Sequence, residues 1–439
     1  MNRPLLLAAT CVGALVSVGA HASPANDCHV GAYRLADSSI VDIAPSEEDR
    51  LRWRKLDGTT GWLRKSEDDR WTSTYGWTDR SDGKQVSFSA CDTAKIQFAG
   101  VSGRRIDFDV TETTFHSRDV DLAGRLILPK SHGRVPLVVL MHGAEPDSAR
   151  DFNPLQRIFP AQGVGAFVYD KRGTGASQGQ YTQDFGVLAD DAVAAMREAR
   201  RIAGGRVGRT GFQGGSQGGW VEPIAATRIP VDFVIVSFGL AVTVIDEDQE
   251  EVALEMRLKG HNAEEISKAL EVADAAEAVI SSAFTQGFER FDVVRAKYRN
   301  EPWYKDVHGN YTYMLLPYTA DELREKGKQY VFGTPWHYDP MPTLRAVQAP
   351  QLWVLGEDDL ESPSAETSRR LQSLIQAGRP ITLALYPHVE HGMTEYEVGP
   401  DGARVSTRYA AGYFVMLRDF AATGRLRGPY GASVITAGN

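Results

Sequence analysis

Residues 211–220 read Gly211-Phe212-Gln213-Gly214-Gly215-Ser216-Gln217-Gly218-Gly219-Trp220, which sets one serine between glycines two positions before it and two positions after it. This spacing is typical of a nucleophile elbow, a sharp turn that joins a strand to a helix. A Cβ atom at Gly214 or Gly218 would clash in so tight a turn, which explains the residue type at both positions. The turn exposes the hydroxyl of Ser216 at a helix N-terminus, where the backbone N–H of Gln217 can bind an oxyanion.

The sequence on either side of Ser216 agrees with this interpretation. Because the chain contains 42 glycines, the same pattern can also arise as an ordinary glycine turn. Residues 206–212, however, predict a short strand that enters the turn. Residues 220–228 predict a short helix, in which Ala225 and Ala226 can pack closely against a sheet. We therefore interpret Ser216 as a nucleophile.

The elbow lies in a region, from about residue 109 onward, in which predicted strands alternate with predicted helices. Nearly continuous apolar runs occupy residues 135–141, 165–169, 231–238, 351–355 and 381–385. Runs of this kind are typical of parallel strands that are buried on both faces. Residues 188–202 carry apolar side chains at helical spacing. This alternation predicts an α/β fold with a doubly wound, mostly parallel sheet.

The chain has 439 residues, too many for one ordinary domain, and its first part has a different texture. We predict a small all-β domain over residues 23–108, which contain four of the eight tryptophans and the hairpin signals Asp57-Gly58 and Asp82-Gly83. The aromatic side chains can pack in the core of a small sheet or bind a ligand such as a glycan. Core packing is the favoured interpretation.

Residues 241–338 interrupt the strand–helix alternation with helical sequence. The core is therefore predicted in two parts, residues 109–240 and 339–428, followed by a C-terminal tail of residues 429–439. Asn262 and Glu265 have the spacing of a capping box, and apolar residues follow at helical spacing. An insertion at the carboxyl ends of the strands would lie over the active site as a cap. The alternative is a peripheral helical pair without substrate contact.

Residues 1–22 have the features of a signal peptide. Arg3 supplies a positive charge, residues 5–20 are apolar or small, and Ala20-His21-Ala22 fits a small-x-small cleavage site. The apolar stretch is short, and no second one of spanning length follows. We therefore favour export over a membrane anchor, with no integral membrane span and a periplasmic or secreted location.

Loss of the signal peptide would remove Cys11 and leave two cysteines, Cys28 and Cys91. In an oxidising compartment we expect them to form a disulfide, the alternative being two free thiols. The net charge is −9 without a long basic block, so no nucleic-acid partner is expected. The few cysteines, and the absence of an H-E-x-x-H helix from the sequence, argue against a metal site.

A serine hydroxyl is a weak nucleophile at neutral pH and needs a base, which an acid in turn orients. Two later segments supply such groups. Residues 356–363 contain Asp358 and Asp359, and residues 388–393 contain His388 and His391. Each segment begins where a core strand ends, which is where ligands bind in open α/β sheets. The residue types alone leave both aspartates and both histidines open.

Three motifs then carry a resemblance to a known family. They are Met141-His142-Gly143-Ala144, Tyr169-Asp170-Lys171-Arg172-Gly173-Thr174-Gly175-Ala176-Ser177, and the elbow ending in Gly218-Gly219-Trp220. Over residues 109–428 the chain resembles the α/β-hydrolase superfamily, in particular bacterial carboxylesterases related to serine aminopeptidases and prolyl-oligopeptidase-like hydrolases. In such families the acid lies three residues after the glycine that closes its strand, and the base precedes a glycine.

The resemblance implies roles for particular residues of this chain. It selects Asp359 as the acid and His391 as the base, and it makes the backbone N–H of Ala144 the partner of Gln217 in the oxyanion hole. It also makes His142 a structural histidine. Asp170 and Arg172 are expected to brace the loop after their strand, with a direct catalytic role as the minor alternative.

Glu222 is unexpected on a helix that faces a sheet. It is either solvated or the partner of a cation in the pocket, and the sequence does not decide between the two.

The resemblance implies an exported serine hydrolase that cleaves small or medium carboxylic esters through an acyl-enzyme on Ser216, without a cofactor. The alternative is a serine aminopeptidase or oligopeptidase, which needs an acidic anchor for a substrate amine. Glu247, Glu250 and Glu251 are candidates for that anchor, although solvated charge is their default interpretation. A third hypothesis is an inactive binding module with a hydrolase fold, against which the complete triad argues. The sequence does not indicate an oligomeric state.

Overall fold

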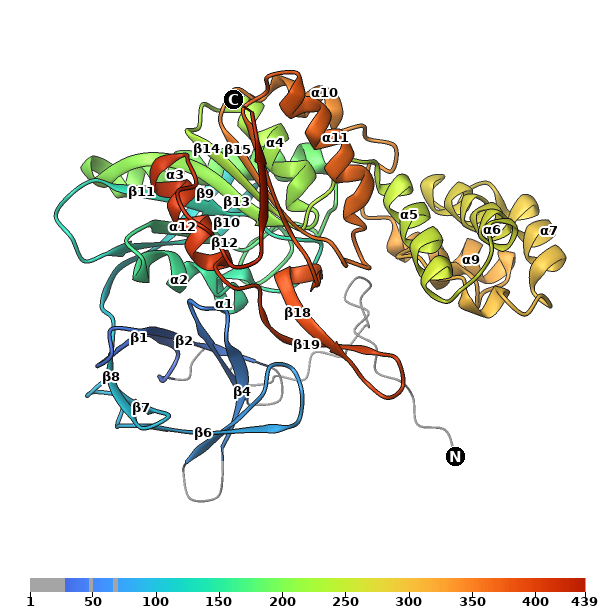
Figure 1. Cartoon of the computed structure of the whole chain (residues 1–439). Helices are drawn as coiled ribbons and strands as arrows, with labels where there is room; N and C mark the ends of the chain where they lie inside the picture. Colours follow the sequence, from blue (N-terminus) through green and yellow to red (C-terminus); the bar gives the residue numbers. More distant parts are fainter. Residues whose placement is uncertain (1–27, 47–49, 66–69, 439) are drawn as a thin grey trace. The chain divides into compact units, whose positions relative to one another are not determined.

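The computed structural model describes residues 28–46, 50–65 and 70–438 (Figure 1). The predicted signal peptide, residues 1–22, lies outside these residues. The chain divides into two compact units by its contacts. One unit comprises residues 243–338 together with residues 144–146, and the other contains the remaining described residues. The larger unit holds a barrel and a large sheet, and the smaller unit is helical.

The N-terminal part of the larger unit is a closed antiparallel barrel, drawn in blue in Figure 1. Its strands are β1 (Gly31–Leu35), β2 (Ile40–Pro45), β3 (Leu51–Lys55), β4 (Thr60–Lys65), β5 (Trp71–Thr74), β6 (Ser81–Phe88), β7 (Lys95–Phe98) and β8 (Val101–Arg105). Trp53 and Trp71 are buried in its core with Leu63 and Phe98. These two tryptophans therefore serve core packing, the interpretation that the sequence favoured.

One of the two predicted hairpin turns is confirmed and the other is wrong. Asp57-Gly58 lies in the turn between β3 and β4, where Gly58 has a φ of +96°. Asp82-Gly83 instead lies inside β6, where the register with β5 shifts, and the chain turns earlier, at residues 75–80. Glycine in the left-handed region, here at a φ of +74°, suits a bulge as well as a turn. The dipeptide alone cannot distinguish the two.

Cys28 and Cys91 form the predicted disulfide, with their Cα atoms 5.7 Å apart. The bond joins the segment before β1 to the loop between β6 and β7. It closes a loop that contains six of the eight barrel strands, so it constrains the unfolded chain over most of the barrel.

The larger sheet has nine strands in the order β20-β16-β15-β14-β13-β11-β12-β10-β9. They are β9 (Phe108–Ser117), β10 (Val120–Pro129), β11 (Val135–Leu140), β12 (Gly165–Tyr169), β13 (Val207–Gly215), β14 (Phe233–Ser237), β15 (Gln351–Gly356), β16 (Ile381–Tyr386) and β20 (Val434–Ala437). Strands β11 to β16 pair in parallel with their neighbours among themselves. Strands β9, β10 and β20 pair antiparallel. The predicted mostly parallel sheet is confirmed, and all five apolar runs lie on its parallel strands.

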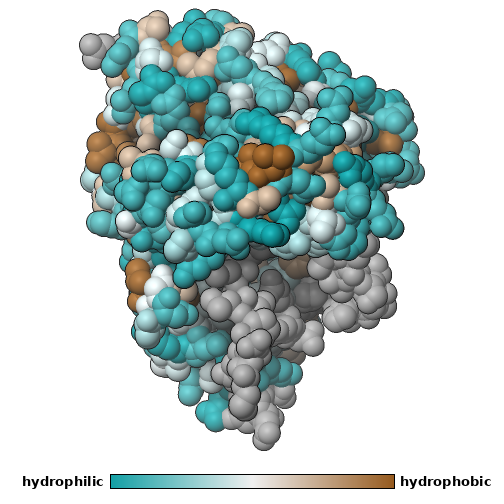
Figure 2. Space-filling model, turned by 90° about the vertical axis from the view of Figure 1, so that its right-hand side faces the viewer, coloured by the Kyte–Doolittle hydropathy of each residue, from teal (hydrophilic) through white to brown (hydrophobic). Residues whose placement is uncertain are grey.

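Helices cover both faces of this sheet, as a doubly wound fold requires (Figure 1). The short α1 (Ala149–Phe152), α2 (Leu155–Ala161) and α12 (Tyr413–Thr423) pack on one face. On the other face lie α3 (Phe185–Ala203), α4 (Gly218–Arg228), α10 (Met341–Ala346) and α11 (Ser364–Gln376). Hydrophilic residues predominate on the surface drawn in Figure 2, and apolar residues form small separate groups there.

Two elements differ from the sequence-based expectation. The predicted tail, residues 429–439, contains β20, which pairs antiparallel with β16 at the edge of the sheet. Residues 389–409 form a separate sheet of β17 (Val389–Glu390), β18 (Thr394–Val398) and β19 (Arg404–Tyr409). Strands β18 and β19 carry charged side chains and lack the apolar pattern of a core strand. Strand β20 reads Val-Ile-Thr-Ala, which suits a strand, but it is only four residues long and exposed.

The smaller unit contains α5 (Val244–Leu258), α6 (Ala263–Ser281), α7 (Phe288–Tyr298), α8 (Thr312–Leu315) and α9 (Ala320–Lys326). Asn262 caps α6 in the predicted capping box with Glu265. The unit has a core of its own, in which Phe291, Tyr298 and Trp303 are buried. Among the described residues, none of the helices has both the length and the apolar character that crossing a membrane requires.

Candidate active site

Ser216 lies in the predicted turn between β13 and α4. Its φ is +52°, in the left-handed region that residues other than glycine rarely adopt. Its backbone N–H donates to the carbonyl of Ser237 at 3.1 Å, and its carbonyl accepts from the N–H of Gly219 at 2.8 Å. A Cβ atom on Gly214 would overlap the carboxyl group of Glu222 and lie 2.7 Å from Met141 Cβ. The surroundings therefore hold the serine in a strained elbow, as predicted. A Cβ atom on Gly218 would lie 3.2 Å from the Glu222 carboxyl group, so the clash predicted there is wrong and that contact is only tight.

Asp359 and His391 come together beyond the ends of neighbouring strands. Asp359 follows β15, and His391 follows β16 and the short β17. The Nδ1 atom of His391 is 3.0 Å from Asp359 Oδ2 and 3.3 Å from Oδ1. The Asp359 carboxylate is buried and also accepts from the N–H of Ser362 at 2.8 Å. A carboxylate fixed in this way can orient an imidazole and stabilise its protonated form.

Phe238 connects the elbow to this acid–base pair. Its ring centroid is 4.7 Å from that of His391, in an edge-on contact. A Cβ atom on Gly215, the residue before Ser216, would overlap the same ring. Phe238 therefore lies against both the nucleophile turn and the imidazole. Sequence reasoning missed it, because a bulky residue at the end of an apolar strand is an ordinary core signal.

Glu361 is a second residue that sequence reasoning missed. Its Oε1 atom is 3.6 Å from Nε2 of His391, on the side of the ring opposite Asp359. The side chain is one-third exposed, so it is open to solvent. A carboxylate at this place can hold a cation, either the protonated imidazole or an ammonium group of a ligand. The only signal in the sequence was its position in the same segment as Asp359.

The two alternative residues pair with each other instead. His388 Nδ1 is 3.4 Å from Asp358 Oδ2, and the histidine side chain is 89% exposed. Asp358 also accepts from the phenol of Tyr396 at 2.8 Å. Burial, together with this bond to Asp358, raises the pKa of Tyr396 to about 12. The surface location of His388 and these contacts favour Asp359 and His391 as the acid and base.

His142 is buried, and its Nε2 atom contacts the carbonyl oxygen of Tyr169. Burial, with Lys171 nearby, lowers the pKa of His142 to about 4, so this imidazole is neutral at neutral pH. Both observations suit the structural role that the resemblance implied. Ala144, the second predicted oxyanion donor, belongs to the smaller compact unit, so its role stays a prediction.

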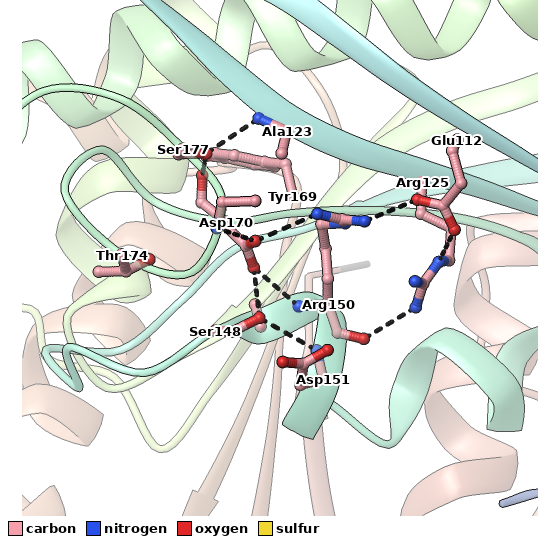
Figure 3. Close-up of polar contacts among 12 residues, drawn as sticks. Glu112, Ala123, Arg125, Ser148, Arg150, Asp151, Tyr169, Asp170, Thr174 and Ser177 are labelled. Carbon is pink, nitrogen blue, oxygen red and sulfur yellow. Dashed lines mark hydrogen bonds and ion pairs between the residues drawn. The ribbon is translucent and has the colours of Figure 1, made fainter. Parts of the chain in front are cut away.

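Asp170 organises the loop after β12 (Figure 3). Its buried carboxylate accepts from Ser148 Oγ at 2.8 Å, from the N–H of Arg150 at 3.1 Å and from the N–H of Ala176 at 3.0 Å. Its carbonyl oxygen accepts from Ser177 Oγ at 2.6 Å. Arg150 extends the network to Glu112 at 2.8 Å (Figure 3).

Arg172 acts on the same loop from the other side. It holds Asp191 of α3 through two bonds of 2.8 Å, from Nε and from one terminal nitrogen. Both Asp170 and Arg172 therefore brace this loop, as predicted.

Glu222 is fully buried on α4, so the solvated interpretation is wrong. Within the described residues, neither of its carboxyl oxygens has a hydrogen-bond partner. Burial raises its pKa well above the usual 4.5, which keeps the group protonated and neutral. Solvated charge was also wrong for Glu247 and Glu251, which are buried on α5.

The described residues bring Glu251, Glu255 and His308 of the helical unit within 4.8 Å of one another. Grouped acidic side chains of this kind are common in proteins that bind no metal there, so we assign no metal to them.

Comparisons with known proteins place these observations in context. No family model and no curated protein matches the chain. An esterase of Pyrococcus furiosus is 14% identical, with 65% of this chain and 84% of the other covered, at a TM-score of 0.41. An acylaminoacyl peptidase of Pyrococcus horikoshii is 13% identical over 88% of this chain and 57% of the other, at a TM-score of 0.44. Est1E of Butyrivibrio proteoclasticus, solved with ferulic acid, is 15% identical over 64% and 90%, at a TM-score of 0.37.

At these identities and TM-scores, the likenesses do not assign a function. By their printed names, these neighbours are two esterases or esterase-like proteins and a peptidase.

Proposed function

We propose that the chain is an exported serine hydrolase that cleaves carboxylic esters through an acyl-enzyme on Ser216. The observation that carries this proposal is the strained elbow, combined with the 3.0 Å contact between His391 and Asp359. All three residues follow the carboxyl ends of core strands, where open α/β sheets bind ligands. The ring of Phe238, which lies against both the elbow and the imidazole, supports their assembly into one site.

In the proposed mechanism His391 takes the proton of Ser216 as the hydroxyl attacks the acyl carbonyl, and Asp359 stabilises the imidazolium that results. The backbone N–H groups of Gln217 and Ala144 would hold the tetrahedral oxyanion, at roughly 3 kcal/mol for each donor. His391 then protonates the leaving alcohol. Water repeats the sequence of steps, attacks the acyl-enzyme and releases the acid together with free Ser216.

The proposal has two further parts. Export is supported by the signal-peptide features and by the disulfide between Cys28 and Cys91, since such bonds persist in oxidising compartments. We also propose that residues 243–338 act as a cap that selects substrates. They lie between β14 and β15 in the chain, so the chain enters them from the carboxyl end of β14.

A serine aminopeptidase is the second candidate, and Glu361 is the observation that favours it. A peptide substrate with a free amine needs an acidic anchor close to the reacting carbonyl. The carboxylate of Glu361, 3.6 Å from Nε2 of His391 and partly exposed, has the charge and position for this role. Substrate preference therefore has to be measured for amides as well as for esters.

The test compares p-nitrophenyl acetate and butyrate with aminoacyl p-nitroanilides, for the wild type and for Ser216→Ala. We expect ester turnover that disappears in Ser216→Ala while the circular dichroism spectrum is unchanged. A fluorophosphonate should label the wild type only. Turnover of the anilides without ester turnover would favour the peptidase, and failure of Ser216 to label would favour an inactive binding module.

A further inference from the structure

The N-terminal barrel contacts strand β19 through two of its loops. In the β3–β4 turn, the carbonyl of Gly58 accepts from the N–H of Tyr409 at 2.9 Å. In the β5–β6 loop, the N–H of Trp77 donates to the carbonyl of Ser406 at 2.9 Å, and the Trp77 ring lies edge-on to Tyr409 at 5.3 Å. Arg54 of β3 adds a bond of 3.0 Å to the Tyr409 phenol. The barrel thus holds the middle and the C-terminal end of β19.

The fit between the barrel and β19 leaves no room for a methyl group at two glycines. A Cβ atom on Gly58 would overlap the carbonyl of Tyr409, and one on Gly76 would lie 2.6 Å from Thr407 Cα. A cation–π stack within the barrel supports the contact. The guanidinium of Arg52, a buried residue, lies 4.1 Å from the ring centroid of Trp77 and 4.9 Å from that of Trp62.

Strand β19 in turn reaches the histidine loop. Ser406 Oγ is 2.9 Å from Thr394 Oγ1, and that hydroxyl donates to the carbonyl of His391 at 3.3 Å. The N–H of Ala410, just after β19, donates to the carbonyl of Met393 at 2.8 Å. These bonds fix the backbone of residues 391–394 from the β19 side.

The same small sheet also reaches the acid loop. Arg404 of β19 donates to the carbonyl of Asp358 at 2.7 Å and pairs with Glu390. Glu390 accepts from the N–H of Leu360 at 3.3 Å, and Tyr396 of β18 binds the Asp358 carboxylate. Asp359, between these two anchored neighbours, is therefore held from β18 and β19 as His391 is.

We propose that the barrel is a positioning module for the acid–base pair, which grips β19 and through it keeps His391 against Asp359. The inference rests on the proposed function, because the positions of His391 and Asp359 affect the rate only if these residues catalyse a reaction. It assigns positioning roles to Gly58, Gly76 and Thr394, none of which touches the reacting atoms. An imidazole that shifts by about 1 Å from its partner can lose on the order of a hundredfold in rate.

The barrel offers matched controls for a test. Gly83 and Gly100 have φ values of +74° and +82°, as Gly58 and Gly76 have +96° and +58°, but nothing lies within 4 Å of a Cβ atom built on either of them. Alanine therefore meets the same kind of backbone strain at all four positions and meets β19 at two of them only. We expect Gly58→Ala and Gly76→Ala to lower kcat for p-nitrophenyl acetate about tenfold or more, with little change in KM. Gly83→Ala and Gly100→Ala should keep the wild-type kcat.

A second pair of variants tests the link between β19 and His391 without adding a methyl group between the barrel and β19. Thr394→Val removes the hydroxyl between Ser406 and His391, whereas Thr394→Ser keeps it. We expect the valine variant to lose kcat, and to broaden the downfield proton resonance of the Nδ1–H bonded to Asp359. The serine variant should restore both. If Gly58→Ala or Gly76→Ala fails to fold, the two Thr394 variants decide the question alone.

The outcomes separate the two proposals. If Ser216→Ala retains esterase activity, the proposed function is wrong and this inference falls with it. The positioning role alone is wrong if Ser216→Ala is inactive but two other results hold. These are that Gly58→Ala and Gly76→Ala have the same kcat as Gly83→Ala, and that Thr394→Val has the same kcat as Thr394→Ser.

Discussion

Replacement of Glu222 by glutamine should change how the stability of the protein depends on pH. The folded protein keeps this buried carboxyl protonated, because burial raises its pKa well above 4.5, whereas the unfolded chain releases the proton near 4.5. Stability from this group is therefore fully present below about pH 4.5, and it is lost as the pH rises toward the raised pKa of the folded state. The slope of that loss is about 1.4 kcal/mol for each pH unit.

The assay is urea unfolding at pH 5, 6 and 7. Relative to Glu222→Gln, the wild type should lose unfolding free energy between pH 5 and pH 7, at up to about 1.4 kcal/mol for each pH unit. Glu222→Leu is the control, since it does not titrate either and should follow the glutamine variant in slope, whatever its absolute stability. Parallel pH profiles for the wild type and both variants would refute the reasoning. They would mean that Glu222 is ionised in the folded protein beneath the elbow.

Two further predictions concern the acid and the barrel. Asp359→Asn should lower kcat by about 10⁴-fold, as loss of the acid does in a serine triad, whereas Asp358→Asn should stay within about threefold of the wild type. Similar losses in steady-state assays of both variants would contradict the assignment of Asp359. Asp42→Asn should lower the unfolding free energy by about 3 kcal/mol, because it removes the negative charge that lies 2.6 Å from the largely buried guanidinium of Arg157. Asp79→Asn, which changes an exposed ion pair of the same barrel, should leave the urea midpoint unchanged. Equal losses of stability in Asp42→Asn and Asp79→Asn would show that burial of the ion pair does not determine the loss.

The sequence predicted the parts of the fold in which local pattern and burial agree. The runs at residues 135–141 and 351–355 are apolar at nearly every position, because parallel strands between two helix layers have no solvent face. The Gly-x-Ser-x-Gly spacing is a local sequence pattern, although the clash that requires glycine at Gly214 comes from Glu222 of α4 and from Met141. Residue types alone could assign the acid and the base only to residues 356–363 and 388–393. The family resemblance then selected one residue in each segment.

The parts that the sequence did not predict depend on distant contacts. Strands β18 and β19 carry Glu395, Glu397 and Arg404, so their pattern is that of a solvated loop, yet backbone bonds and the Tyr409 ring join them to the barrel. The dipeptide Asp401-Gly402 between them was the available hairpin signal. The burial of Glu222 was equally unreadable, since a charged residue on a helix is solvated in most proteins.

The bond between Arg54 and Tyr409 joins residues that are 355 positions apart. Contacts of such large sequence separation form late in folding, because closing the long loop between the two residues costs chain entropy before the contact stabilises the fold. During synthesis the barrel can fold first, whereas Tyr409 of its partner strand leaves the ribosome 355 residues after Arg54. Under the positioning role proposed above, enzymatic competence would appear only after β19 has bound the barrel, and a chain released before β19 is made would contain the nucleophile turn yet be inactive.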